Sequence, residues 1–131
     1  MTRYGAFNQG LRRLTALGEF LDGTIEHAYF GTPSELTATV GWGRRKYARR
    51  ARRVAQVQAI PFLCLEDGFL RSVGLGSAEP PLSIVVDDLG IYYDATQPSR
   101  LESFITRPRT PEEIVRAQAL VTAWRHARVS K

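Results

Sequence analysis

The sequence has 131 residues, the length of one ordinary domain, and contains 44% hydrophobic and 24% charged residues. This balance is typical of globular proteins and excludes the disordered and membrane-embedded classes. No apolar run approaches the roughly 20 residues that span a bilayer. The segment up to Gly10 also lacks the pattern of a signal peptide. We therefore expect a cytoplasmic protein with a single domain over residues 1–131.

The net charge of +5 comes from one local segment. Seven basic residues and no acid lie between Arg44 and Arg53, and removing these seven from the total leaves −2. Such a cluster attracts phosphates, anionic lipid headgroups or the acidic face of a partner protein, and the charge alone does not distinguish among them. The residues that we expect to make these contacts are Arg45, Arg49, Arg52 and Arg53.

The first predicted element is a helix from Asn8 to about Gly23. Its leucines recur near the helical period, and Asn8 is placed to cap it. The segment 25–30 is short and apolar, which is compatible with either a strand or a loop. Residues 36–42 form a β-rich run that Gly43 ends, which predicts a strand followed by a tight turn.

The basic segment predicts a helix that Pro61 ends. One face of it is apolar and the other carries the arginines; the apolar face comprises Tyr47, Ala48, Ala51, Val54, Ala55 and Gln58. Residues 61–65 then form a continuous apolar run, as in strands buried on both faces of a parallel sheet. Strand, helix and strand in succession indicate the crossover unit of α/β folds.

Glycine and proline are frequent between Gly68 and Pro81, which indicates a loop. It contains Gly74-Leu-Gly76, which is too short for a dinucleotide-binding fingerprint and is weak evidence for phosphate binding. Residues 82–86 predict a strand, and residues 90–93 predict a further short one.

Two helices are predicted in the last third of the chain. Ser99 is placed to cap a helix through Phe104. Thr110, followed by proline and two acids, starts a helix that runs to about Arg128. The sequence stops directly after this helix, which we interpret as a cut in a longer protein.

Glu66 and Asp67 directly follow the predicted strand 62–65. Ligands of open α/β sheets gather at this end of the strands. A carboxylate there can serve as a base or a nucleophile, and Gly68 allows a sharp exit or the close approach of a substrate. Considered by chemistry alone, the commoner role of two such acids is to cap a loop. The guanidinium of Arg71 can orient one of these carboxylates or bind an anionic sugar acid, and a plain surface ion pair is about as common at such a spacing.

Other polar and aromatic residues give weaker evidence of a functional site. Asp87, Asp88 and Asp94 do not have the spacing of an EF-hand, and a turn with Asx-type hydrogen bonds is the favoured interpretation. The indole of Trp42 could stack on a sugar, although a tryptophan at a strand end more often fills the core. Neither histidine has another Cys or His at ligand spacing, so we predict no metal site. The single cysteine, Cys64, lies in an apolar run and predicts a buried thiol.

Several segments together resemble one known family. They are Gly41-Trp-Gly43 with the basic helix, Leu65-Glu-Asp-Gly-Phe-Leu-Arg-Ser-Val-Gly-Leu-Gly76, Pro80-Pro-Leu-Ser83, Asp87-Asp-Leu-Gly-Ile-Tyr-Tyr-Asp-Ala-Thr96 and Pro98-Ser99. These segments look like the capsule polysaccharide biosynthesis and export family that contains the KpsC/LipA-type β-Kdo transferases. The resemblance extends from about residue 36 to the end of the chain.

The resemblance implies an α/β fold: the Rossmann-like, acceptor-side half of a GT-B glycosyltransferase, with a mostly parallel sheet flanked by helices. It implies transfer of Kdo from CMP-Kdo, with retention of the β configuration, to a lipid glycerophosphate primer or a Kdo linker. Asp67 would be the catalytic carboxylate, as nucleophile or as base, and Glu66 its neighbour in positioning or proton transfer. Gly68, Arg71, Ser72 and Trp42 would bind substrate. No cofactor or metal is implied.

The sequence also departs from this family's pattern. Family members hold CMP with a second half that carries a His-Pro motif, and this sequence contains no His-Pro dipeptide. We therefore expect little or no activity from these residues alone. In the complete enzyme, the resemblance implies as partners the inner-membrane surface and the proteins of capsule assembly and export.

Two other classes of function remain open. A non-enzymatic binding module would dock on anionic lipid or an acidic partner through the basic helix, and the acidic pair would then be only a turn. Nucleic-acid binding ranks third, because the basic helix lacks the interleaved aromatic residues of single-strand binders. We therefore expect no nucleic-acid partner.

Overall fold

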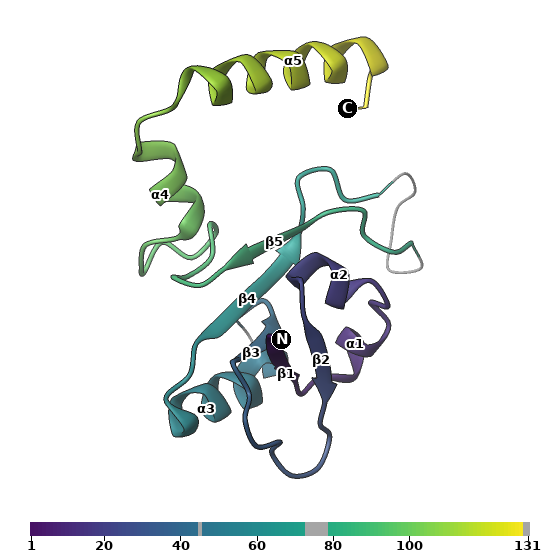
Figure 1. The fold of residues 1–131 in the computed structure, drawn as a ribbon, viewed down its shortest axis with the longest axis vertical. Helices are drawn as coiled ribbons and strands as arrows, with labels where there is room; N and C mark the ends of the chain where they lie inside the picture. The colour runs from purple at the N-terminus through teal and green to yellow at the C-terminus, as the bar shows by residue number, and fades with distance from the viewer. Residues whose placement is uncertain (45, 73–78, 130–131) are drawn as a thin grey trace.

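A five-stranded sheet organises the chain (Figure 1). The computed structural model describes residues 1–44, 46–72 and 79–129. The strands follow the order β2-β1-β3-β4-β5, and every neighbouring pair is parallel except β4 and β5. The mostly parallel α/β sheet predicted from the sequence is therefore confirmed. The strands are β1 (Arg3–Ala6), β2 (Thr24–His27), β3 (Ala38–Trp42), β4 (Phe62–Asp67) and β5 (Ile84–Asp87).

Two short helices, α1 (Gln9–Arg12) and α2 (Leu17–Leu21), cover one face of the sheet. The single helix expected from Asn8 to Gly23 is therefore wrong. Backbone hydrogen bonds of the i to i+3 type, from Leu14 to Leu11 and from Leu17 to Leu14, interrupt the helical pattern between them. The break lets Leu11 and Leu17, each 1% exposed, enter the same core, and this burial outweighs the continuity of the helix.

The opposite face carries a short 3-10 turn, η1 (Lys46–Ala48), and helix α3 (Arg49–Gln58). The predicted apolar face of the basic helix is confirmed at its buried positions, Ala48, Ala51, Val54 and Ala55. Tyr47 lies outside it and is 62% exposed. The buried hydroxyl of Thr39 on β3 donates to the carbonyl of Ala51 at 3.0 Å, which fixes α3 against the sheet.

The chain after β5 turns instead of forming the short strand expected at residues 90–93, so that prediction is wrong. Asp87 explains the turn, since its buried carboxylate accepts hydrogen bonds from the backbone N–H groups of Leu89, Gly90 and Arg100. Asp88 pairs with the Arg100 guanidinium at 2.6 Å. The Asx-type turn expected around these acids is confirmed at Asp87.

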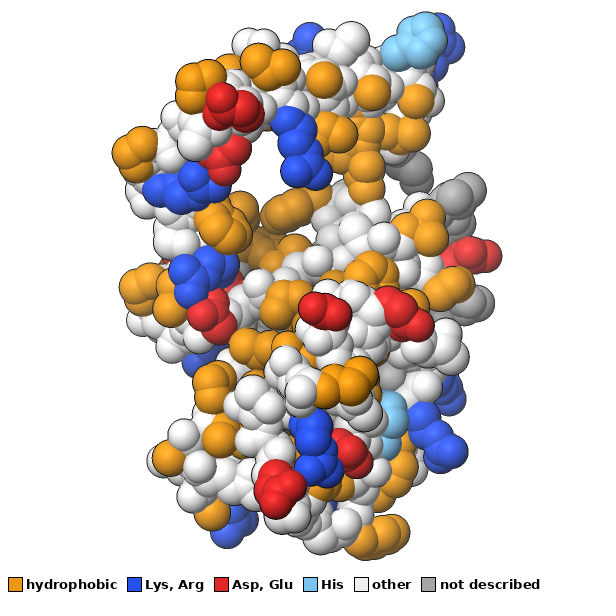
Figure 2. Space-filling model, in the orientation of Figure 1, with side chains coloured by type: hydrophobic (Ala, Val, Ile, Leu, Met, Phe, Trp, Pro, Cys, Tyr) orange, Lys and Arg blue, Asp and Glu red, His pale blue; other side chains and the backbone are white. Residues whose placement is uncertain are grey.

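Helices α4 (Arg100–Thr106) and α5 (Pro111–Ala127) complete the described chain. Both begin with the capping boxes that the sequence predicts, at Ser99 and Thr110. Helix α5 buries none of its residues. Between α5 and the sheet, at the end of β4 and the start of β5, lies an apolar groove of about 610 Å³, and Figure 2 shows hydrophobic side chains below this helix. None of the described helices combines the length and hydropathy needed to cross a membrane.

Candidate functional site

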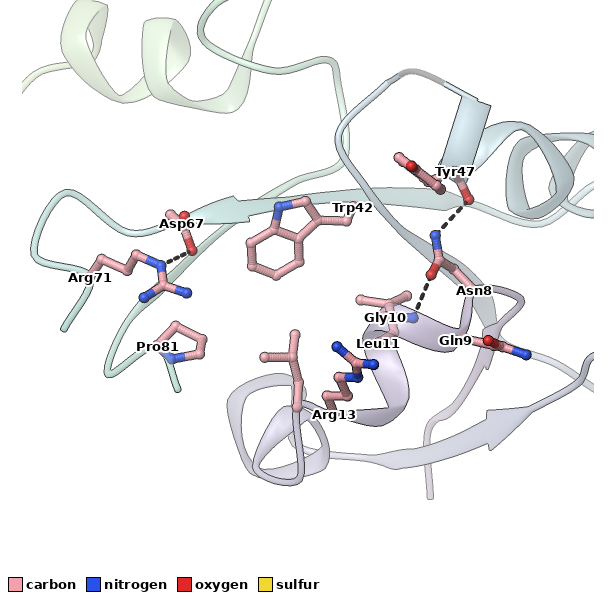
Figure 3. Close-up of a pocket in the computed structure, with 11 residues that line it drawn as sticks. Asn8, Gln9, Gly10, Leu11, Arg13, Trp42, Tyr47, Asp67, Arg71 and Pro81 are labelled. Atoms are coloured by element: carbon pink, nitrogen blue, oxygen red, sulfur yellow. Dashed lines mark hydrogen bonds and ion pairs between the residues drawn. The ribbon is translucent and has the colours of Figure 1, made fainter. Parts of the chain in front are cut away.

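Asp67 is the last residue of β4, and its side chain lines a groove of about 690 Å³ (Figure 3). Alternation along a strand places Leu63, Leu65 and Asp67 on the side of the sheet that α1 and α2 cover. The core confirms this placement, because both leucines pack with the residues of α1 and α2. Asp67 therefore continues a buried row of side chains to the point where the row meets solvent.

Asp67 and Arg71 form an ion pair within the groove. The Arg71 Nε donates to Asp67 Oδ1 at 2.8 Å, and the side chains of Arg71 and Asp67 are 28% and 45% exposed. The Arg71 Nη1 also donates to the hydroxyl of Ser72 at 2.9 Å. Among the described residues, none donates a hydrogen bond to Asp67 Oδ2. The pair therefore fixes one carboxylate oxygen, while the other has no hydrogen-bond donor among the described residues.

Trp42 contributes to both the core and the groove. It ends β3, pairs in register with Leu65, and packs partly buried against the core. The same indole lines the groove beside Asp67 and Arg71 (Figure 3). The structure thus brings Trp42, Asp67 and Arg71 together, with Ser72 adjoining them through Arg71.

Glu66 lies on the other side of the sheet. Its Oε1 accepts a hydrogen bond from the Tyr93 hydroxyl at 2.8 Å. Gly43 has φ +62°, and a Cβ there would lie 3.1 Å from that same oxygen and 3.2 Å from the Tyr93 Oη. Burial and then the hydrogen bond to Glu66 raise the pKa of Tyr93. The two adjacent acids therefore do not share one site.

An ion pair holds the loop that supplies Tyr93. Arg44 Nε lies 3.2 Å from Asp94 Oδ2, while Asp94 Oδ1 accepts hydrogen bonds from the backbone N–H and the hydroxyl of Thr96. These hydrogen bonds to Thr96, followed by the charge of Arg44, lower the pKa of Asp94. The loop after β5 is thereby tied to the end of β3, which keeps Tyr93 beside Glu66.

Gly68 faces Ser83, and it does not line the groove that holds Asp67. A Cβ on Gly68 would lie 1.9 Å from the Ser83 hydroxyl oxygen and 2.8 Å from the Ser83 backbone carbon. The Gly68 N–H donates to the Ser83 carbonyl at 3.0 Å. Glycine is required here because two backbone segments meet directly after Asp67.

The basic helix uses part of its charge inside the protein. Arg50 donates to the carbonyls of Tyr29 and Gly31, and its guanidinium lies 5.1 Å from the ring centre of Phe7. Arg52 is half-buried beside Asp87 and Asp88 in a small cavity. Arg49 and Arg53 are exposed, while Arg45 lies outside the described residues.

The other candidates that the structure describes form no site. Burial, followed by the charge of Glu66, raises the pKa of Cys64 to about 12, so its thiol is the buried, inert group that the sequence predicts. His27 and His126 are exposed. The described part of the chain holds no group of three His, Cys, Asp or Glu residues that fits a metal ion. Gly74-Leu-Gly76 lies outside the described residues.

Sequence reasoning assigned no role to two residues that the structure places near the acids. Tyr93 reaches Glu66 across the turn after β5, and its position beside Asp94 gave no indication of this contact. Arg13, at the end of α1, lines the groove opposite Arg71 (Figure 3). Nothing in the leucine pattern of the first helix distinguishes Arg13 from Arg12, because the direction of the side chain depends on the break between α1 and α2.

The fold and the groove define an α/β domain that presents a carboxylate beside a guanidinium at the carboxyl edge of its parallel strands, the usual location of ligands in such sheets. The comparison with known families identifies this domain more closely. The chain belongs to the family of capsule polysaccharide biosynthesis proteins, whose sequence pattern matches residues 37–128.

Two curated relatives and two solved structures support this assignment. The chain is 45% identical to the capsule polysaccharide modification protein LipA of Neisseria meningitidis serogroup A, over 113 residues that make up 86% of this chain. It is 49% identical over 70 residues, 53% of this chain, to the lipopolysaccharide-processing protein LpsZ of Rhizobium meliloti. The chain spans only 16% of the length of each of these relatives.

The solved structures are two transferases from Thermosulfurimonas dismutans. KpsC, described as a β-Kdo 2,4 transferase, is 41% identical with a TM-score of 0.88, over 99% of this chain and 41% of that one. KpsC described as a β-Kdo 2,7 transferase is 26% identical with a TM-score of 0.65, over 96% of this chain and 42% of that one. The arrangement of the described elements is thus that of one part of these larger proteins.

Proposed function

We propose that this chain is the acceptor-side part of a cytoplasmic GT-B transferase that adds β-Kdo during capsule polysaccharide biosynthesis. One observation carries the proposal: Asp67 projects from the tip of β4 into a groove and is paired with Arg71 at 2.8 Å. The similarity to two Kdo transferases supports the same chemistry. The donor is CMP-Kdo, and a second half of a longer polypeptide binds it.

In this proposal Asp67 is the nucleophile of a retaining reaction. Its Oδ2 attacks the anomeric carbon of Kdo, and the bond from that carbon to the phosphate oxygen breaks, so that CMP leaves with the electron pair. The acceptor hydroxyl then attacks the same carbon, displaces the carboxylate and gives its proton to solvent. Arg71 holds Oδ1 throughout, which directs Oδ2 into the groove.

The neighbouring residues support this reaction. The indole of Trp42 provides a flat apolar wall for a sugar ring. Ser72 accepts a hydrogen bond from Arg71 and so limits the movement of its guanidinium. Glu66 acts at a distance, by holding Tyr93 on the other face of the strand that carries Asp67. Gly68 allows the chain to leave β4 against Ser83.

The experiment that tests the proposal uses the complete polypeptide, CMP-Kdo and a Kdo-terminated lipid acceptor. We expect β-linked product, and mass spectrometry of a digest taken before acceptor is added should find one Kdo on the peptide that contains Asp67. α-linked product, formed without this adduct, would instead assign Asp67 the role of a base in an inverting reaction. Absence of Kdo transfer by the complete polypeptide would contradict the proposed function.

A second candidate function is docking on an anionic membrane through α3, as lipid-linked acceptors require the enzyme to work near a membrane. The exposure of Arg49 and Arg53, one helical turn apart, favours it. Because Arg50 binds backbone carbonyls and Arg52 is half-buried beside Asp87 and Asp88, the informative variant is Arg49→Ala with Arg53→Ala. We expect this variant to bind vesicles containing phosphatidylglycerol less tightly than the unmodified protein; equal binding would contradict docking through α3.

A further inference from the structure

The groove beside Asp67 carries an excess of one positive charge among its described lining residues. Its charged side chains are Arg13, Asp67 and Arg71. Asp67 and Arg71 neutralise one another in their ion pair. Arg13 is exposed, and its guanidinium makes no hydrogen bond or ion pair with another described residue. A ligand in the groove therefore meets one cation that has no anionic partner among the residues that the structure describes.

The fold holds Arg13 in a defined place despite its exposure. Its backbone N–H donates to the carbonyl of Gly10 and closes the end of α1. The preceding Leu11 is buried in the core, and Asn8 caps the helix through the N–H of Gly10 at 2.6 Å. Figure 3 shows the Arg13 guanidinium on the α1 side of the groove, with Asp67 and Arg71 on the other side and Trp42 between them.

We propose that Arg13 binds an anionic group of the acceptor, so that the groove selects acceptors carrying a carboxylate or a phosphate near the reacting hydroxyl. The inference rests on the proposed function. The carboxylate of Asp67 would repel an anion bound beside it, and the charge of Arg71 is already balanced by that carboxylate. Arg13 supplies the second cation, which brings the groove with a monoanionic acceptor to neutrality.

The assignment distinguishes Arg13 from its neighbour. Arg12 is the last residue of α1 and is also exposed, but it lines a different depression together with His27. The charge of Arg12 contributes to the lowered pKa of His27, after the effect of burial. Arg12 is therefore a matched control for the charge of α1 that does not face Asp67.

The test compares acceptors with the complete polypeptide. The first acceptor ends in a sugar carboxylate, the second in glycerol phosphate, and the third is the amide of the first, which lacks the charge. For the anion that Arg13 binds, Arg13→Ala should raise KM about tenfold, the scale of one partly exposed charge-assisted hydrogen bond. The KM for the amide should change little, Arg13→Lys should recover part of the loss, and Arg12→Ala should match the unmodified enzyme.

Each outcome decides a separate question. A rise in KM confined to the carboxylate or to the phosphate acceptor identifies the source of the anion. An equal change for charged and uncharged acceptors, or none in Arg13→Ala, would overturn the role of Arg13 while leaving Kdo transfer by the unmodified enzyme intact. Failure of the unmodified enzyme to transfer Kdo would instead refute the proposed function.

Discussion

Glu66 and Asp67 are consecutive residues of β4 whose carboxylates lie on opposite faces of the sheet. Asp67 meets Arg71 in the groove, whereas Glu66 meets the hydroxyl of Tyr93. Since side chains alternate along a strand, two adjacent acids in β4 cannot both face one substrate. In the proposed reaction, Asp67 therefore performs the chemistry directly and Glu66 has a positioning role.

Tyr93→Phe should reduce the stability of the 131-residue chain by about 1 kcal/mol, the usual net value of one hydrogen bond. The substitution removes the hydroxyl that donates to Glu66 at 2.8 Å and leaves the ring contact with Tyr92 in place. Urea unfolding provides the measurement. Tyr92→Phe is the control, and we expect it to leave the midpoint nearly unchanged. A Tyr93→Phe midpoint equal to that control would show that the hydrogen bond contributes nothing.

Gly68→Ala should destabilise the fold by about 1–3 kcal/mol, the range for overpacking at a crowded position. The added methyl carbon would stand 1.9 Å from the hydroxyl oxygen of Ser83, far inside van der Waals contact. Adding Ser83→Gly to this variant should restore part of the loss, because it removes the hydroxyl and the Ser83 Cβ. The midpoint of thermal unfolding measures both effects. Full tolerance of Gly68→Ala alone would refute the close approach.

Arg50→Ala should cost about 1–2 kcal/mol of stability, since it removes hydrogen bonds to two carbonyls and a cation–π contact. Those partners are Tyr29, Gly31 and Phe7. Arg53→Ala, on the same helix but exposed, should change stability by less than about 0.5 kcal/mol. Denaturant unfolding of the two variants side by side provides the measurement. Equal losses would mean that Arg50 has no structural role beyond its charge.

The first turn of α5 should loosen in acid. A hydrogen bond from Arg107, and then one from the backbone of Thr110, lower the pKa of Glu113 from 4.5 to about 2. Because the folded-state pKa is depressed, the ionised carboxylate stabilises the helix start above about pH 4.5, and this contribution is lost as the pH falls towards 2. The protection factor of the Glu113 amide, which is the intrinsic exchange rate divided by the observed rate at the same pH, should fall across that window. In Glu113→Gln this pH-dependent fall should disappear, and its persistence would contradict the role of this carboxylate.

Much of the fold follows from local pattern. The apolar run before Glu66 and the two capping boxes are signals carried by consecutive residues, so β4, α4 and α5 lie close to where the sequence predicts them, although β4 continues through Asp67 instead of ending at Leu65. The break between α1 and α2 does not follow from local pattern, because it depends on which leucines pack against the distant strands β1, β3 and β4. Residues 90–93 have strand-like composition, but the capping bonds of Asp87 decide their conformation.

The site was predictable only in part, for the same reason. The pairing of Asp67 with Arg71 spans four residues, and the sequence contains both partners in one segment. The contacts of Glu66 with Tyr93 and of Trp42 with the groove join segments that only the sheet brings together. The basic run shows the converse: its charges are evident in the sequence, but the partial burial of Arg50 and Arg52 is a property of the folded chain.

The central claim is that the carboxylate of Asp67 performs the chemistry, and kcat for Kdo transfer by Asp67→Asn and Glu66→Gln in the complete polypeptide tests it most directly. Asp67→Asn should lower kcat on the order of a thousandfold or more, while Glu66→Gln should lower it about tenfold at most. A greater loss in Glu66→Gln than in Asp67→Asn, with both proteins folded, would contradict the account.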